Sequence, residues 1–344
     1  MPSIVGGFDI HRKQLTFDYL DTVSGEVTRG QITPAGRGHL RAWLARLENP
    51  QDAAFAAEAC TGWRYVAEEL QRAGVQAHLA EPADTAAARG RKKRAKTDRA
   101  DARLLRDLLA EGRLPECWIP PEHILECRAL LECYHDLRAE HTGWVQRIHA
   151  TLFHQGAPAF HGLGLADGPG QLTALAREHL SPAGQAQIGT CLRMLAAAGA
   201  ELTAVRHRLL AAAAHLRGAK VLTQSLHGAG PVTGLALTCW LGGAGRFSSA
   251  RKAVRFAGLD ITVYSTGGKR SAGHLSRQGP PVLRWCAYEA GKTHAHTTAP
   301  GHPCYAAVKD RAGGKRAALA EARKIVRQAC HILTEPGGDA FTIM

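Results

Sequence analysis

The sequence is poor in acidic residues. It has 30 Asp and Glu against 43 Lys and Arg among 344 residues, so its formal net charge is +13 and its isoelectric point is about 9.6. This imbalance excludes no fold, but it favours a polyanionic partner, most simply a nucleic acid. The length is enough for two or three domains with a sizeable core.

Signals for membrane insertion and secretion are also missing. The sequence has no apolar run of about 18 residues, so we expect no membrane span and no membrane partner. The N-terminal stretch MPSIVGGFDIHRKQL lacks the basic head, apolar middle and small-residue cleavage site of a signal peptide. We therefore expect an intracellular protein, located in the cytoplasm and associated with the nucleoid.

No two of the nine cysteines form a Cys-x-x-Cys pair. The odd count and the expected intracellular context indicate reduced thiols and argue against a zinc site. His294, His296 and His302 lie close together in the sequence without neighbouring Cys or carboxylate residues. A solvated loop is therefore favoured over a metal site for these histidines.

The first hundred residues predict a mixed α/β layer. Strands are expected over residues 4–10, 14–20 and 27–32, followed by a helix from Thr33-Pro34 to about residue 47. Two further strands are expected over 52–58 and 76–79, with a helix over 64–73 between them. Thr97 can cap a last helix over 98–111.

Residues 122–155 predict a long helix. Apolar positions alternate in steps of four and three along it, which indicates either a coiled coil or a long packed hairpin. An ordinary helix facing the core is the alternative. The positions are Leu130, Tyr134, Leu137, His141, Trp144, Ile148 and Leu152, and His141 interrupts the apolar series.

The remaining sequence predicts mainly helices. A connector rich in Gly and Pro over 158–170 precedes two expected helices over 172–216, and residues 247–279 are expected to form loops. The segment from Gly228 to Pro231 is similar to the turn of a helix-hairpin-helix, whose backbone amides can approach a phosphate. A plain Gly-rich turn is the alternative. The last expected helix spans about 314–333.

Four acidic residues stand where a metal-dependent phosphodiester enzyme needs them. Asp9 lies inside the apolar strand GGFDIHRKQLTF, and Glu58 ends the apolar strand AAFAAEA. Burying an unpaired carboxylate is costly, so these two acids call for a metal ion or a partner. Asp98 and Asp101 begin a helix at i and i+3 and so share one face. Such carboxylates can hold Mg²⁺ (or Mn²⁺), although acids in a first helical turn also simply favour the helix dipole.

The densest block of positive charge directly precedes the last two acids. It can grip nucleic-acid backbone near the acids, or it can be a solvated flexible loop. Its members are Arg89, Arg91, Lys92, Lys93, Arg94 and Lys96.

Several segments together resemble one family. GGFDIHRKQLTF, FAAEACTGW and KTDRADARLL resemble the catalytic domain of DEDD transposases of the pilin-inversion type, in the insertion-sequence family one-hundred-ten. Later segments resemble that family's second domain, so the resemblance covers nearly the whole chain. These segments are LHGAGPVTGLAL, RFSSARKAVRFAGLD, YSTGGK, GHLSRQGPPVLRW and HPCYAAVKDRAGGKRAALAEARKIV.

The resemblance implies three regions. The first, over 1–115, is an α/β domain of RuvC-like (RNase H) fold that carries the four acids. The second, over 116–218, is a helical, coiled-coil-like assembly region. The third, over 219–344, is a mainly α-helical transposase domain with the helix-hairpin-helix-like segment.

The resemblance also implies a serine nucleophile in the third region. The matching stretch is YSTGGK, in which Thr266 stands between Ser265 and the glycine that directly follows the serine in many relatives. Ser265 is the predicted nucleophile because its primary hydroxyl is less hindered, and Thr266 is the second candidate. A serine hydroxyl needs a base or a metal ion to activate it. Lys269, Arg270 and Arg277 are predicted phosphate contacts, and the remaining nucleophile candidates are Ser248, Ser249, Ser271 and Ser276.

The predicted function is that of a DNA transposase or recombinase of a mobile element. The resemblance implies Mg²⁺ dependence, a covalent phosphoserine–DNA intermediate, and guidance by a structured noncoding bridge RNA that pairs with donor and target DNA. It also implies a dimer or tetramer in which the acids of one protomer meet the serine of another. The alternatives are a metal-dependent nuclease or Holliday-junction resolvase of RuvC-like fold without a covalent intermediate, and a nucleic-acid-binding protein without enzymatic activity.

Overall fold

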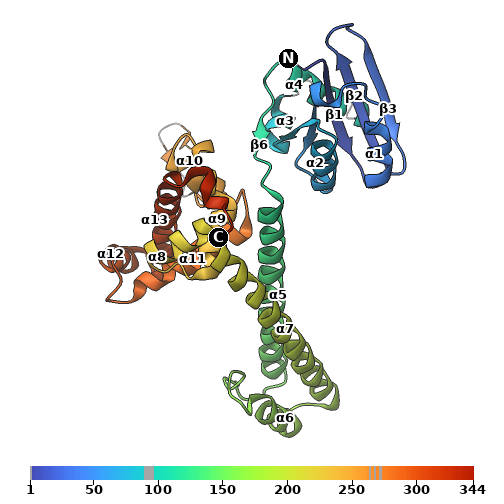
Figure 1. Cartoon of the computed structure of the whole chain (residues 1–344). Helices are drawn as coiled ribbons and strands as arrows, with labels where there is room; N and C mark the ends of the chain where they lie inside the picture. The colour runs from blue at the N-terminus through green and yellow to red at the C-terminus, as the bar shows by residue number, and fades with distance from the viewer. Residues whose placement is uncertain (1, 89–96, 263–264, 267–268, 271–272) are drawn as a thin grey trace. The chain divides into compact units, whose positions relative to one another are not determined.

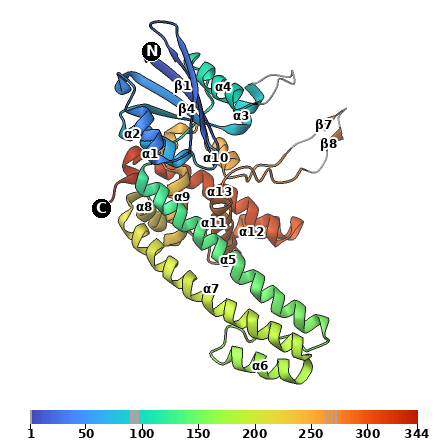
Figure 2. The ribbon, with the colours of Figure 1, turned by 90° about the vertical axis from the view of Figure 1, so that its right-hand side faces the viewer.

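The structure is a computed structural model that describes residues 2–88, 97–262, 265–266, 269–270 and 273–344 (Figures 1 and 2). The chain divides into two units, Met1–Pro120 and Pro121–Met344, which are treated separately below. The first is α/β and the second is mainly helical, as the sequence predicts. The finer division into three regions stays a prediction.

A six-stranded mixed sheet forms the centre of the first unit. Its order is β3-β2-β1-β4-β5-β6, in which β1 runs parallel to β4 and β4 runs parallel to β5, and the other neighbouring pairs are antiparallel. The strand β1 is therefore the point at which the strand order turns, because β2 and β3 lie on one side of it and β4, β5 and β6 lie on the other. The strands are β1 (Ile4–Ile10), β2 (Leu15–Asp21), β3 (Val27–Ile32), β4 (Ala53–Glu58), β5 (Gln76–Ala80) and β6 (Glu116–Cys117).

Helices cover both faces of this sheet. Side chains alternate between the faces of a strand, so Phe8 and Phe55 pack with Leu40 of α1 and Leu70 of α2 in one large apolar cluster. Ala56 packs on the opposite face against Leu105 of α4. The helices are α1 (Arg37–Leu44), α2 (Trp63–Arg72), α3 (Pro82–Ala88) and α4 (Asp98–Ala110), and a 3₁₀ turn η1 covers Pro50–Asp52.

The helix α4 lies directly on strand β1 at Gly7. A Cβ atom added at Gly7 would lie 2.2 Å from the carbonyl oxygen of Ala102, so only glycine allows this approach. A buried ion pair holds the same helix to the neighbouring strand, because Arg106 of α4 binds Asp18 of β2. Asp18 also accepts a hydrogen bond of 2.7 Å from Arg29. These contacts fix the start of α4 over the end of β1.

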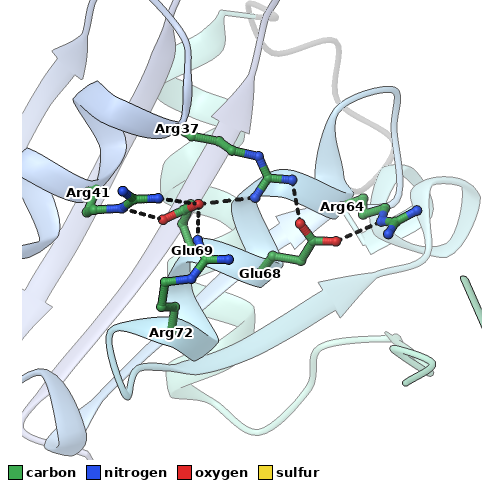
Figure 3. Close-up of polar contacts among 6 residues, drawn as sticks. All are labelled: Arg37, Arg41, Arg64, Glu68, Glu69 and Arg72. Carbon is green, nitrogen blue, oxygen red and sulfur yellow. Dashed lines mark hydrogen bonds and ion pairs between the residues drawn. The ribbon is translucent and has the colours of Figure 1, made fainter. Parts of the chain in front are cut away.

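A second ion cluster holds α1 to α2 (Figure 3). The Glu69 carboxylate is buried, and it accepts hydrogen bonds from Arg37, Arg41 and Arg72, with an Arg41 Nε–Glu69 Oε2 distance of 3.0 Å. Hydrogen bonding from Arg41, more than from the other arginines, lowers the pKa of Glu69 to about 2. Glu68 extends the cluster by binding Arg37 and the helical neighbour Arg64.

We expect Glu69→Gln to lower the stability of the first unit by about 3 kcal/mol at pH 7, since it leaves several arginine donors without their charged acceptor. A carboxyl group whose pKa falls from 4.5 to about 2 on folding stabilises the fold above pH 4.5 and loses that contribution as the pH falls toward 2. Urea unfolding of the first unit, followed in the full chain at several pH values, measures both effects.

The matched control is Glu68→Gln. The Glu68 side chain is 20% exposed and its ion pairs lie nearer solvent, so we expect a loss of about 1 kcal/mol or less. Equal losses in the two variants, or a loss for Glu69→Gln that does not shrink toward pH 2, would contradict this account.

One helix boundary and one loop assignment predicted from the sequence are wrong. The first helix was expected to begin at Thr33-Pro34, but α1 begins at Arg37, because residue 36 is still extended. The segment 247–279 was expected to form loops, but it contains helix α10 (Ala250–Phe256). Ala253 and Val254 of α10 are buried, so tertiary packing stabilises this short, basic helix.

The second unit contains a long helical hairpin. The helices α5 (Glu122–His154) and α7 (Pro182–His215) pack along each other, and α6 (Gly168–His179) covers their far end (Figures 1 and 2). Ile148 and Leu152 of α5 are fully buried there with Leu172 of α6. The hairpin that the spacing of apolar residues predicts is therefore present, and the earlier positions of that series are only partly buried.

The rest of this unit packs around α9 (Pro231–Leu241), in which every residue from Gly234 to Leu241 is buried. A short turn joins α9 to α8 (Arg217–Ser225), an arrangement that fits both a helix-hairpin-helix and a plain Gly-rich turn, so the helix-hairpin-helix stays a prediction. The other helices are α11 (Pro281–Lys292), α12 (His302–Ala312) and α13 (Gly314–Thr334), with 3₁₀ turns η2 (Ala244–Arg246), η3 (Thr293–Ala295) and η4 (Gly337–Phe341). The short strands β7 (Ser265–Thr266) and β8 (Lys269–Arg270) pair antiparallel.

The helix α7 is long and apolar enough, by length and composition, to cross a membrane, with a mean hydropathy of 1.3 over 18 residues. The sequence-based expectation of no such segment is therefore wrong on these two criteria. A single helix of this kind is weak evidence of a membrane span. In α7 the apolar character comes largely from alanine, and the helix packs along α5.

Candidate active site

Asp9 and Glu58 lie near the carboxyl ends of the two central parallel strands, on the same face of the sheet. Phe8 of β1 is paired with Ala57 of β4, and each acid is the next residue of its strand. Because side chains alternate along a strand, Asp9 shares the face of Gly7, and Glu58 shares the face of Ala56. That is the face covered by α4.

The other two acids come from the first turn of α4. Thr97 caps this helix, as the sequence predicts, with its hydroxyl accepting a hydrogen bond of 3.2 Å from the backbone N–H of Ala100. Asp98 and Asp101 follow in the first turn, and both are near enough to Asp9 to raise its pKa. The structure therefore brings all four predicted acids to one edge of the sheet, at the carboxyl ends of β1 and β4.

His11 also belongs to this cluster, and the sequence-based prediction omitted it. Its Nε2 atom lies 3.3 Å from Asp9 Oδ2 and 3.4 Å from Asp98 Oδ1, and one ligand atom from each of these three residues lies within 4.8 Å of the others. The signal was available in the sequence, because His11 stands two residues after Asp9 and therefore continues the same face. Gln14 adds a hydrogen bond of 3.2 Å to Asp98 Oδ2.

The Asp9 carboxyl group has a strongly perturbed pKa. Burial raises it most, and the neighbouring acids Asp98, Asp101 and Glu58 raise it further, while His11 lowers it; the result is about 6. Asp9 Oδ2 is also buried without a hydrogen-bond partner. A divalent cation relieves a buried carboxylate oxygen that accepts no hydrogen bond and lies among like charges. Carboxylate oxygens with an imidazole nitrogen are suitable ligands for Mg²⁺ or Mn²⁺. The residues present therefore fit a metal ion.

The predicted nucleophile lies in the other unit, on the strand pair of β7 and β8. The backbone register places Ser265 opposite Arg270 and Thr266 opposite Lys269. Two of the predicted phosphate contacts are thus the strand partners of the two nucleophile candidates. The third, Arg277, is exposed and has a left-handed backbone with φ +52°.

The other serine candidates have different surroundings. Ser276 donates a hydrogen bond to Asp260, and Ser249 directly precedes α10. Ser248 is exposed. Ser271 lies outside the described residues, as does the whole basic run from Arg89 to Lys96.

The histidines near α12 were expected in a solvated loop, and this is wrong for His294. Its side chain is buried, and Nδ1 lies 3.8 Å from a carboxylate oxygen of Glu321 on α13. The acid is remote in the sequence, so a local pattern could not reveal it. Among the described residues, the group of Asp9, His11 and Asp98 is the one cluster with metal-ligand spacing.

Two family models match the chain. One, described as a transposase and specific to the DEDD type of IS110 elements, matches residues 6–154, which include all four acids. The other, described as Transposase IS116/IS110/IS902 family, matches residues 221–306, which include Ser265. No curated protein shows significant similarity to the chain.

Proposed function

We propose, from the premise that this chain carries IS110-family transposase domains, that it cuts and rejoins DNA strands to move an insertion element by way of a covalent phosphoserine intermediate. The DEDD-type domain implies a divalent metal, and the transposase domains imply DNA substrates and strand cleavage with rejoining. The observation that carries the proposal is the cluster of Asp9, His11 and Asp98, set beside Glu58 and Asp101 within the matched DEDD domain.

Asp9, Glu58, Asp98 and Asp101 are the proposed metal-binding acids, and His11 is a fifth candidate ligand. When bound, Mg²⁺ or Mn²⁺ would neutralise charge that develops on the reacting phosphate and lower the pKa of an attacking hydroxyl. The chain's own contribution is to hold these side chains at the ends of two adjacent strands and one helix. The ion pair of Asp18 with Arg106 and the close approach at Gly7 keep the helix in place.

Ser265 is the proposed nucleophile. Its Oγ would form a bond to phosphorus, the bond between phosphorus and one deoxyribose oxygen would break, and the released sugar oxygen would take up a proton. Attack of a second DNA hydroxyl on the phosphoserine would reverse these bond changes and release the serine. This step conserves the energy of the phosphodiester, so rejoining needs no further energy source. Lys269, Arg270 and Arg277 are the proposed phosphate contacts.

The helices α5 and α7 are the proposed assembly element. Their hairpin leaves Met194 of α7 42% exposed within an alanine-rich stretch, and several positions of the α5 series are only partly buried. Contact with another protomer would bury these side chains. A dimer or tetramer formed in this way would let the acids of one protomer meet the serine of another.

A structured noncoding RNA is the proposed guide. The net charge of +13 and the dense basic run at residues 89–96 favour a large polyanion, but phosphate contacts do not distinguish RNA from DNA. A metal-dependent nuclease or junction resolvase with the same first unit is the second candidate function. The cluster of acids fits that enzyme equally well, but the nuclease has no use for Ser265.

The test is to express the protein together with its native flanking DNA, purify it, and sequence the RNA that accompanies it. We expect one defined RNA that maps to the flank, and we expect the complex to join donor and target DNA in the presence of Mg²⁺. Random or absent RNA would contradict RNA guidance. Cleavage without any joined product would favour the nuclease.

A further inference from the structure

A pocket of about 790 Å³ opens at the carboxyl ends of β1 and β4. Three short segments line it: residues 10–12 at the end of β1, residues 35–37 at the start of α1, and residues 60–62 together with Tyr65 at the start of α2. Open α/β sheets bind ligands outside the carboxyl ends of their strands, at the point where the strand order reverses. Here that point is β1. The volume lies within the range of about 300–1,000 Å³ that is typical of ligand sites.

The pocket has a mainly apolar wall with one aromatic ring. Ile10 shares the face of Phe8, so it extends the apolar cluster beneath α1 and α2 into the pocket. Tyr65 packs against the same cluster and remains partly exposed. Tyr65 and Cys60 are both partly buried, and this burial raises the pKa of each side chain.

Gly62 keeps the pocket open. A Cβ atom there would lie 3.2 Å from Ile10 Cγ2 and 3.6 Å from Tyr65 Cε1, between the two apolar walls. Its φ of +102° also disfavours any side chain. The ion cluster around Glu69 fixes the helix α1, which carries Arg37 of the pocket lining (Figure 3). The ion pairs of Arg37 therefore hold one lining residue of the pocket in place.

The pocket adjoins the acid cluster through His11. This residue lines the pocket, and its Nε2 atom lies within 3.4 Å of oxygens of Asp9 and Asp98. Arg12, the next residue, is exposed at the rim. When a DNA strand has one phosphate at the acid cluster, its next nucleotide is therefore close to the pocket. The pocket offers that nucleotide an apolar, aromatic cavity and the charge of Arg12.

We propose that this pocket binds one unstacked nucleobase of the DNA strand whose phosphate lies at the acid cluster. The proposal rests on the proposed function above. The base stacks on Tyr65 and fills the cavity, while Arg12 contacts the neighbouring phosphate. Stacking on an aromatic side chain suits any base, so the pocket holds the strand in register without selecting a sequence.

Gly36 allows a test that leaves the fold intact. It lines the pocket, a Cβ there meets no atom within 4 Å, and its φ of 164° is extended backbone that any residue adopts. Gly36→Leu therefore fills the cavity without strain. Gly38→Leu is the matched control, because Gly38 has the same free space but lies outside the pocket lining, on the exposed side of α1.

The experiment measures binding of duplexes with the sequence of the element's end, each with a single abasic nucleotide at one position near the cut. The protein is the full complex with its copurified RNA. One abasic position should weaken binding to the wild type by about 5- to 150-fold, the range expected for one lost stacking contact. Gly36→Leu should weaken binding of intact DNA by a similar factor. An abasic nucleotide at the sensitive position should then weaken binding to Gly36→Leu no further. Tyr65→Ala should behave like Gly36→Leu, and Tyr65→Phe and Gly38→Leu should behave like the wild type.

Two results would overturn the proposal. In the first, no abasic position weakens DNA binding to the wild type. In the second, the same abasic position weakens DNA binding to the wild type and to Gly36→Leu by the same factor. The same pattern produced by abasic nucleotides in the RNA would assign the pocket to an RNA base instead. Cleavage by the wild-type complex separates the two hypotheses. If the wild type cuts DNA but no abasic position weakens its binding, only the proposed role of the pocket is refuted. If the wild type never cuts DNA, the proposed function is refuted and this inference with it.

Discussion

Asp9→Asn should abolish DNA cleavage and, at the same time, stabilise the protein in the absence of metal. Loss of a central metal ligand should lower the cleavage rate by roughly 10³-fold or more, which is about 4 kcal/mol of transition-state stabilisation. The gain in stability has a separate cause. Asp9 is ionised at pH 7 in a site that opposes its charge, so the neutral amide removes an unfavourable interaction.

The pH dependence of this gain follows from the raised pKa. Folding raises the pKa of Asp9 from 3.8 to about 6, so the folded state loses stability as the pH rises through this interval. The loss above pH 6 is up to about 3 kcal/mol. We therefore expect Asp9→Asn to be the more stable protein at pH 7–8, and to lose this advantage below about pH 4.

Thermal unfolding with and without Mg²⁺ measures the effect. Metal that binds only the folded state stabilises the wild type, so the wild type should gain stability with Mg²⁺ while Asp9→Asn should not. Protonation of Asp9 competes with the metal ion, so the affinity for Mg²⁺ should fall as the pH drops below 6. The control is Asp52→Asn, an exposed aspartate outside the cluster, which should respond to Mg²⁺ like the wild type. If the Asp9→Asn variant still gains stability with Mg²⁺ and still cuts DNA, the assignment of Asp9 as a metal ligand is wrong.

Ser265→Ala should remove both the covalent protein–DNA adduct and the joined product, with a loss of at least about 10³-fold. Radiolabelled DNA that stays with the protein on a denaturing gel detects the adduct, and mass spectrometry of the labelled peptide identifies the residue. This change removes one hydroxyl group and leaves the acids and the basic residues in place. RNA binding should therefore remain at the wild-type level.

Thr266→Ala is the matched control, because Thr266 is the adjacent residue on the same short strand and the second nucleophile candidate. It should keep the adduct. An adduct that survives Ser265→Ala and disappears in Thr266→Ala would move the nucleophile by one residue. Full cleavage by both variants, without any adduct in the wild type, would favour the metal-dependent nuclease.

Local sequence patterns determined the class of the fold and the four acids. The short apolar runs of β1 and β4 and the cap at Thr97 are properties of short segments, so the strands and the start of α4 could be predicted before any tertiary contact was known. The boundaries of α1 and the existence of α10 could not, because packing of their buried residues outweighs weak local preferences.

Only the tertiary structure decided which groups meet. The parallel pairing of β1 with β4 sets Glu58 beside Asp9, although 49 positions separate them in the chain, and α4 adds Asp98 across from His11. The raised pKa of Asp9, the buried Glu69 cluster and the pocket at Gly62 likewise depend on contacts between remote segments. Burial and charge proximity are properties of three-dimensional distance, so the sequence could supply these residues but not their electrostatic environment.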